Sequence, residues 1–224
     1  LLGDFVEKGD FPLFSTVKKL LAELQKELNN ITNSANVAWI IVPGNHDLCY
    51  DSKVGKKTLY AFNEFASAVT HAEIAFSDEC SIFEADHFGY HIISISSVLN
   101  SEYSFGAIDY NLLNKCNFPA NTIVVTHHSL ISGDSGDNAV IRNGYELQTY
   151  LETRNVVALL HGHTHGCKRY TVGQDCQVIG VGPMFKPVPD ISNQCNVIHI
   201  DGNSVRKITT LLYQDDRKVW DSVD

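Results

Sequence analysis

The sequence predicts an α/β domain: a two-sheet β-sandwich whose sheets pack face to face, flanked by helices. Helical and strand-like patterns alternate along the chain as far as residue 160. After residue 165 the pattern contains only strands, separated by Gly, Asp and Asn, and these strands should be mostly antiparallel. No linker, repeat or low-complexity segment divides the chain, so we read residues 1–224 as one domain.

Amphipathic spacing predicts the helices. In residues 15–30 the apolar side chains form a helical stripe, and Ser15 is a suitable N-cap for that helix. Further helices are expected at 58–69, 108–116 and 144–154.

Continuous apolar runs predict buried strands. The run at 37–42 ends in Pro43-Gly44, which is a turn signal. Residues 51–57 and 132–137 should be the least ordered, and each directly follows a motif, which favours a loop that faces a substrate. The other strands are expected at 90–98, 122–126, 156–160, 168–172, 177–181, 196–200 and 205–213.

The composition is that of a globular protein with a sizeable core, since 44% of the 224 residues are hydrophobic. A net charge of −9 argues against a protein that binds duplex DNA through a positive surface. It is compatible with an enzyme that meets phosphates through metal ions, because the ions supply the positive charge. Six dispersed cysteines without a CxxC pair, no recognisable signal peptide and no apolar stretch of membrane length together predict a cytoplasmic protein without membrane contact.

Metal-type ligands follow four of the strand-like runs directly. They are Asp4; Asn45, His46 and Asp47; His127 and His128; and His161, His163 and His165. Because binding sites of α/β sheets form outside the carboxyl ends of the strands, these side chains should converge. Six of the ten histidines lie in these turns, and histidine is the commonest metal ligand. The four turns therefore predict a metal centre.

The ordered set Gly-Asp, Gly-Asn-His-Asp, His-His and Gly-His-x-His resembles the calcineurin-like metallophosphoesterases over nearly the whole chain. The resemblance implies a two-sheet sandwich with a dinuclear metal centre at one edge. It also implies hydrolysis of a phosphodiester or phosphomonoester by a metal-bound hydroxide that attacks phosphorus in line. The mixed nitrogen and oxygen ligands suit two divalent ions, which we expect to be Mn, Fe or Zn.

The resemblance also implies a role for each ligand. Asp4 would bridge both metals, while Asn45, His127 and His163 would bind the second metal. His165 would reach the first metal. If the turn is extended, its alternate residues point the same way, so His163 and His165 would both face the metal pair.

Two further residues of the second motif would act in catalysis. His46 is similar to the family's catalytic histidine, which is not a ligand and which protonates the leaving oxygen or stabilises phosphoryl charge. Asp47 would orient His46. His128 is expected to line the pocket, and His161 is expected to support or pack behind the ligands.

The sequence departs from the family pattern in two places. The family's first motif, Asp-x-His, would precede Gly-Asp, where this sequence has only two leucines. We therefore expect a longer parent chain that carries the fold's first strand, because otherwise the first metal keeps only Asp4 and His165. Glu7 and Lys8 stand where the family often has Asp-Arg.

Three functional interpretations remain open from the sequence. The leading one is a metallophosphoesterase acting on a nucleotide, a nucleic acid or a small phosphoester. Within enzymes, the chain could be a nuclease or cyclic-nucleotide phosphodiesterase rather than a phosphomonoesterase. The third is a metal-poor domain that binds a nucleotide or a partner protein without turnover. Separately, we expect a longer parent protein whose other domains choose the substrate.

Overall fold

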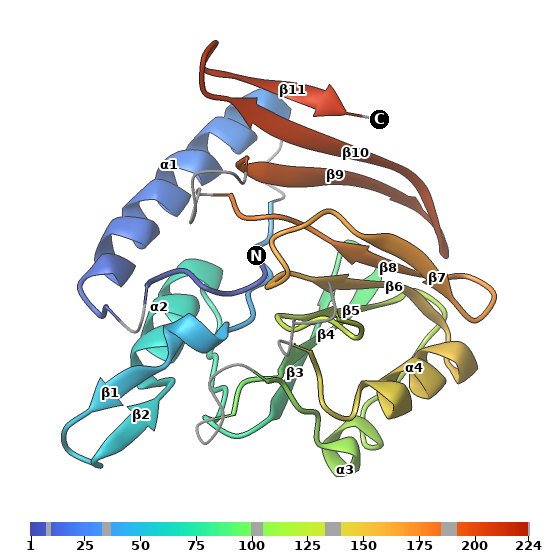
Figure 1. Ribbon diagram of the computed structural model, residues 1–224, viewed down its shortest axis with the longest axis horizontal. Coiled ribbons are helices and arrows are strands. Elements are labelled where there is room, and N and C mark those ends of the chain that lie inside the picture. The colour runs from blue at the N-terminus through green and yellow to red at the C-terminus, as the bar shows by residue number, and fades with distance from the viewer. Residues whose placement is uncertain (8–9, 33–36, 100–104, 133–139, 185–191, 224) are drawn as a thin grey trace.

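A computed structural model describes residues 1–7, 10–32, 37–99, 105–132, 140–184 and 192–223. Its central sheet has six strands in the order β3-β4-β5-β6-β8-β7 (Figure 1). The four inner strands are parallel and the two edge strands are antiparallel to their neighbours. The bounds are β3 (Ser81–His87), β4 (Tyr90–Ser96), β5 (Thr122–Thr126), β6 (Val156–His161), β7 (Arg169–Val172) and β8 (Cys176–Gly180).

A second sheet contains the last three strands, β9 (Gln194–Asp201), β10 (Ser204–Gln214) and β11 (Val219–Val223). All three are antiparallel, as the sequence predicts for the late strands. This sheet lies across the end of the central sheet, and β10 contacts β6 (Figure 1). Two sheets with helices outside confirm the predicted α/β class.

The four predicted helices are all present: α1 (Leu13–Thr32), α2 (Tyr60–Thr70), α3 (Tyr110–Leu113) and α4 (Gly144–Thr153). The predicted N-cap is wrong. Ser15 lies inside the first turn of α1, and its hydroxyl donates to the Pro12 carbonyl at 2.9 Å. The helix begins earlier because Pro12 precedes it with a fixed φ that suits a helix start. No helix in the described ranges is both long and apolar enough to span a bilayer.

The central sheet is buried on both faces. On one face Ile123 and Val125 pack into a core with α1 and α2, which includes Phe62. On the other face Val124 and Leu159 pack into a core with α3 and α4. Apolar residues at consecutive positions of β5 and β6 are therefore required, and this explains why these strands read as continuous apolar runs.

Two predicted segments differ in the structure. Residues 37–42 are extended but join neither sheet; instead the Leu1 nitrogen donates to the Ile40 carbonyl at 2.6 Å, and the Val42 nitrogen donates to the Leu1 carbonyl at 3.2 Å. The segment 51–57 is the tip of an antiparallel hairpin: residues 52–55 form the turn between β1 (Cys49–Asp51) and β2 (Lys56–Thr58). Most of 132–137 lies outside the described residues.

Candidate metal centre

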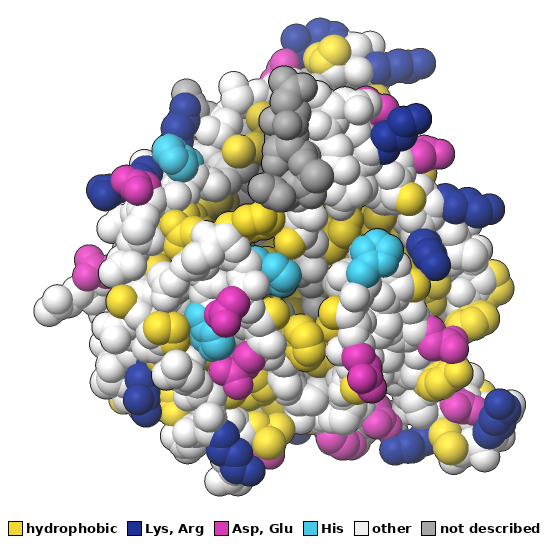
Figure 2. Space-filling model, turned by 180° about the vertical axis from the view of Figure 1, so that it is seen from behind, with side chains coloured by type: hydrophobic (Ala, Val, Ile, Leu, Met, Phe, Trp, Pro, Cys, Tyr) yellow, Lys and Arg dark blue, Asp and Glu magenta, His cyan; other side chains and the backbone are white. Residues whose placement is uncertain are grey.

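The motif residues follow the ends of neighbouring extended segments. Asn45–Asp47 form a short 3-10 turn after segment 37–42, His127 follows β5, and His163 lies in the turn after β6. Asp4 follows the first extended residues, which pair with segment 37–42. On the face opposite to that of Figure 1, histidine and acidic side chains border a hollow (Figure 2).

Three potential ligand atoms gather around a fourth, the Nε2 atom of His127. The Nδ1 atom of His163 lies 2.8 Å from it, the amide oxygen of Asn45 3.1 Å, and a carboxylate oxygen of Asp4 3.3 Å. Donors that each bind one cation at about 2.0–2.2 Å lie roughly 3 Å apart, which matches this spacing. Two imidazoles, one amide oxygen and one carboxylate therefore fit a divalent transition metal. These are the residues predicted for the second metal.

The backbone fixes the orientation of His127, which is buried. Its Nδ1 atom donates to the Leu2 carbonyl at 2.5 Å, and this leaves Nε2 as the atom that can bind a metal. The approach is close: a Cβ added to Gly3 would lie 2.6 Å from His127 Nδ1, and one added to Gly44 would lie 2.2 Å from an Asp4 carboxylate oxygen. Only glycine fits at these two positions.

Asp4 is held at the centre of this cluster in a left-handed conformation, with φ at 56°. One of its oxygens accepts a hydrogen bond from the His46 backbone at 2.9 Å, and the other faces His127. Burial alone would raise the pKa of Asp4, but the charge of His127 and its hydrogen bond hold that pKa well below its usual range. The carboxylate is therefore ionised and available to a cation.

Asp47 has a different task from the predicted one. Its fully buried carboxylate accepts four backbone N–H groups, from Gly44, Asp4, Phe5 and Val6, at 2.8–3.2 Å. These bonds tie the Asp4 turn to the 3-10 turn, so Asp47 positions backbone rather than the His46 ring. Burial and the neighbouring Asp4 charge raise the pKa of Asp47 to about 7, against the opposing effect of the N–H donors.

Glu7 takes the place expected of Asp47 beside His46. Its Oε1 atom lies 3.2 Å from His46 Nδ1. A carboxylate in this position can fix the orientation of the ring. Sequence reasoning missed this pair, although one signal was present: Glu7 stands where the resembled family often has an acidic residue.

The turn after β6 is not extended. His163 and His165 both have left-handed φ values, 64° and 50°, and the Thr164 nitrogen donates to the Gly162 carbonyl at 2.8 Å. The expectation of an extended turn with alternating side chains is therefore wrong. Within the described residues, the imidazoles grouped at ligand distance are those of His127, His128 and His163. A ligand role for exposed His165 stays a prediction.

His128 and His161, the other two motif histidines beside the predicted ligands, are both buried. His128 places its ring 4.7 Å from that of His163, and its Nδ1 atom lies 2.8 Å from the Ser97 hydroxyl. His161 ends β6 and packs on Gly180, where an added Cβ would lie 2.7 Å from the ring. Burial lowers the pKa of both groups, to about 4 for His161. Both rings are therefore neutral at pH 7.

Comparison with known proteins gives one family. The model of the calcineurin-like phosphoesterases matches residues 1–167. No curated protein sequence matches the chain.

Three solved structures are reported as similar to this chain. Sulfate thiohydrolase SoxB of Thermus thermophilus, in complex with glycerol, is 10% identical with a TM-score of 0.46, over 98% of this chain and 39% of that one. A hypothetical protein, also from Thermus thermophilus, is 11% identical with a TM-score of 0.45, over 95% and 97% of the chains. GAP50 of Plasmodium, an anchor in the inner membrane complex, is 13% identical with a TM-score of 0.30, over 65% and 54%.

The family assignment rests on the matched range, which covers 167 of the 224 residues. It contains each of the four residues whose ligand atoms gather at His127 Nε2. The chain belongs to the calcineurin-like phosphoesterase family.

Proposed function

We propose that this chain is a metal-dependent phosphoesterase that hydrolyses a phosphodiester or a phosphomonoester. The observation that carries the proposal is the convergence of ligand atoms from His163, Asn45 and Asp4 within 3.3 Å of His127 Nε2. A bound divalent ion would polarise the phosphoryl group and make a water molecule acidic. The resembled family implies two such ions; in the described residues the ligand atoms of one site stand together.

The residues around the cluster would prepare the substrate and supply a proton. His46 follows Asn45 directly, and its backbone is fixed by Asp4. Because Nδ1 of His46 faces Glu7, the proton for the leaving oxygen would come from Nε2. Glu7 would hold the His46 ring in the orientation that this proton transfer needs.

The test separates metal binding from chemistry. Hydrolysis of bis(p-nitrophenyl) phosphate is measured with Mn²⁺, and Mn²⁺ affinity is measured by calorimetry. We expect Asn45→Ala to weaken Mn²⁺ binding, and we expect His46→Ala to bind Mn²⁺ normally while losing about 100-fold or more in kcat. Activity that survives both substitutions would remove the assignment.

A second function is favoured by the exposure of His165 outside the cluster. A domain with only one assembled site could bind a nucleotide or a partner without turnover. Metal analysis distinguishes the two: less than one equivalent of metal, with no hydrolysis of cyclic nucleotides, single-stranded DNA or phosphomonoesters, supports the binding domain. The same panel identifies the substrate class of an active enzyme. A cytoplasmic location and further domains in the parent protein are part of this proposal.

A further inference from the structure

The extended segment 37–42 is hydrogen-bonded along one edge only. Leu1 pairs with Ile40 and Val42. In an extended chain the N–H and C=O groups of successive residues point to opposite edges, so those of Trp39 and Ile41 face away from Leu1. In the described part of the chain, no hydrogen bond reaches the backbone of Trp39 or Ile41.

At Ile41 this free edge is withdrawn from water, while Trp39 is half-buried. Ile41 is only 4% exposed. Buried backbone N–H and C=O groups are almost always paired in folded proteins, because leaving one unpaired costs as much as losing a hydrogen bond. The buried, unpaired backbone of Ile41, together with the unpaired backbone of Trp39 on the same edge, therefore indicates that a partner completes the edge.

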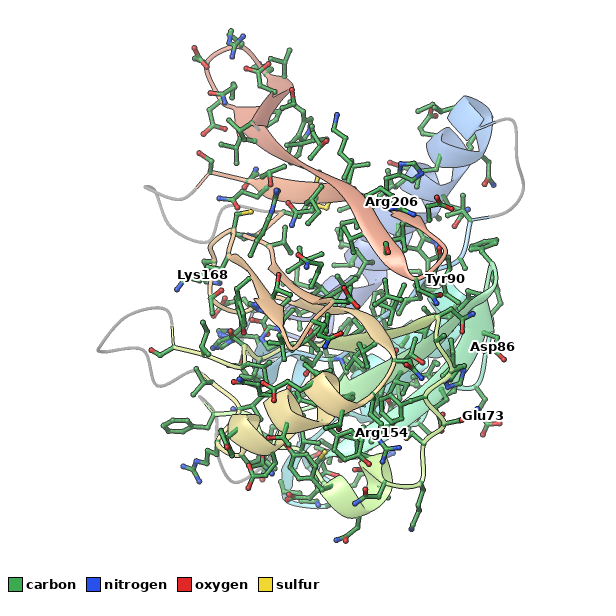
Figure 3. The ribbon with its side chains drawn as sticks, turned by 90° about the vertical axis from the view of Figure 1, so that its right-hand side faces the viewer. Glu73, Asp86, Tyr90, Arg154, Lys168 and Arg206 are labelled. Atoms are coloured by element: carbon green, nitrogen blue, oxygen red, sulfur yellow. The ribbon has the colours of Figure 1, made fainter. Side chains whose placement is uncertain are left out.

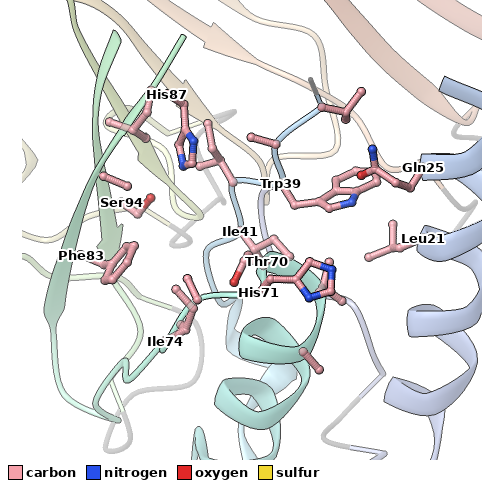
Figure 4. A pocket seen from close by; sticks show the side chains of 18 of the residues that line it. Leu21, Gln25, Trp39, Ile41, Thr70, His71, Ile74, Phe83, His87 and Ser94 are labelled. Carbon is pink, nitrogen blue, oxygen red and sulfur yellow. The ribbon is translucent and has the colours of Figure 1, made fainter. Parts of the chain in front are cut away.

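The free edge borders a cavity of about 620 Å³. Figure 4 shows Trp39 reaching toward Leu21 and Gln25 of α1 on one side, while Phe83 and Ser94 of the β3–β4 hairpin stand on the other side. The turn after α2 closes one end of the cavity. The space is therefore a slot with a strand edge as its floor and apolar walls on both sides.

The described lining of this slot lacks the negative charge of the whole protein. Among the described residues, its lining includes the cation of Lys18 and no carboxylate. Glu73 and Asp86, which adjoin lining residues in sequence, point outward into solvent (Figure 3). In a chain of net charge −9, this arrangement favours an acidic occupant.

We propose that the slot docks an extended, acidic peptide segment of a partner protein, which adds a strand to the edge at Trp39 and Ile41. An added strand offers donors and acceptors at the two-residue spacing of these groups. A lipid chain would fill the apolar walls but would leave the backbone groups unpaired. At about 3.3 Å per residue, residues 37–41 can pair with roughly five residues of a partner.

The experiment uses the Trp220→Phe variant, in which Trp39 is the single tryptophan of the two in the sequence. The probe is the peptide acetyl-Asp-Val-Ile-Val-Ile-Val-Asp-amide, titrated while Trp39 fluorescence is followed. Hydrogen exchange then reports the amides of Trp39 and Ile41. We expect saturable binding and slower exchange of both amides in the complex.

Three controls make the result specific. A peptide N-methylated at alternate residues loses strand hydrogen bonds, so it should bind about tenfold more weakly. Ala85→Phe narrows one wall and should weaken binding similarly, whereas Ala120→Phe, at an exposed alanine outside the slot, should not.

Equal affinity for a peptide with Lys in place of Asp, or unchanged amide exchange at Trp39 and Ile41, would overturn the proposal. A third result would also overturn it. If both amides are protected without peptide, and the protection increases with protein concentration, a second copy of the chain occupies the slot.

Discussion

Residues 37–47 connect two regions with opposite hydrogen-bonding states. At the C-terminal end of this stretch, Asp47 accepts four backbone N–H groups and holds two turns against each other beside the metal cluster. Toward its start, the described backbone leaves Trp39 and Ile41 unpaired beside an apolar slot. Backbone hydrogen bonds are thus made beside the metal cluster, where the ligand atoms need fixed positions. They are absent at the described edge of Trp39 and Ile41, where we propose that a strand is added.

The first prediction concerns the ligand at the centre of the paired region. His127→Ala removes the imidazole around which the other ligand atoms gather, so Mn²⁺ affinity should fall by about 100-fold or more. His199→Ala, at an exposed histidine of β9, is the matched control and should bind Mn²⁺ normally. Calorimetric titration measures both. Normal affinity in His127→Ala would place the metal elsewhere.

The second prediction tests whether Asp47 holds the turns together. Asp47→Asn replaces one acceptor oxygen by an NH₂ group that faces two backbone N–H donors. The free energy of unfolding should fall by about 3 kcal/mol, because buried donors lose their acceptor. Asp51→Asn removes a single exposed bond to Lys53 and should change it by about 0.5 kcal/mol or less. Urea denaturation gives both values, and equal losses would contradict the role given to Asp47.

The third prediction compares the two regions directly. In the protein without added peptide, the amides of Phe5 and Val6 donate to Asp47 and should exchange slowly. The amides of Trp39 and Ile41 should exchange at least about tenfold faster, although Ile41 is as buried as Val6. Hydrogen exchange resolved by NMR measures all four. Comparable exchange rates for the two pairs of amides would contradict the proposed difference in backbone hydrogen bonding between the two regions.

The parts of this structure that were predictable are those with local signals. Apolar runs at 122–126 and 156–160 marked β5 and β6 because these strands are buried on both faces. The metal cluster followed from the rule that strand ends converge, together with the family resemblance of Asp4, Asn45, His127 and His163. Each strand and each motif is recognised from residues that are close together in the sequence.

What escaped prediction depends on contacts between distant residues. The four N–H groups bound by Asp47 include three that lie about forty residues earlier, and no periodic pattern records such a bond. The left-handed backbone at His163 and His165 is set by a local turn that breaks the assumed alternation. The β3 strand was missed because its exposed edge position tolerates polar residues such as Glu84 and Asp86.

The smallest predicted effect on the free energy of unfolding belongs to an exposed ion pair. It serves as the comparison for the buried carboxylate of Asp47. His91 lies between Asp86, at 2.8 Å, and Glu84, at 2.9 Å. Burial opposes protonation, but the hydrogen bonds to both carboxylates raise the pKa of His91 above its unfolded value. The pairing therefore stabilises the fold fully below about pH 6.5 and loses this effect as pH rises through the raised pKa. His91→Gln should lower the free energy of unfolding by about 0.5 kcal/mol more at pH 5.5 than at pH 9. If His91→Gln lowers the free energy of unfolding as much as is expected for Asp47→Asn, then exposed ion pairs and buried hydrogen-bonded carboxylates do not differ in this protein.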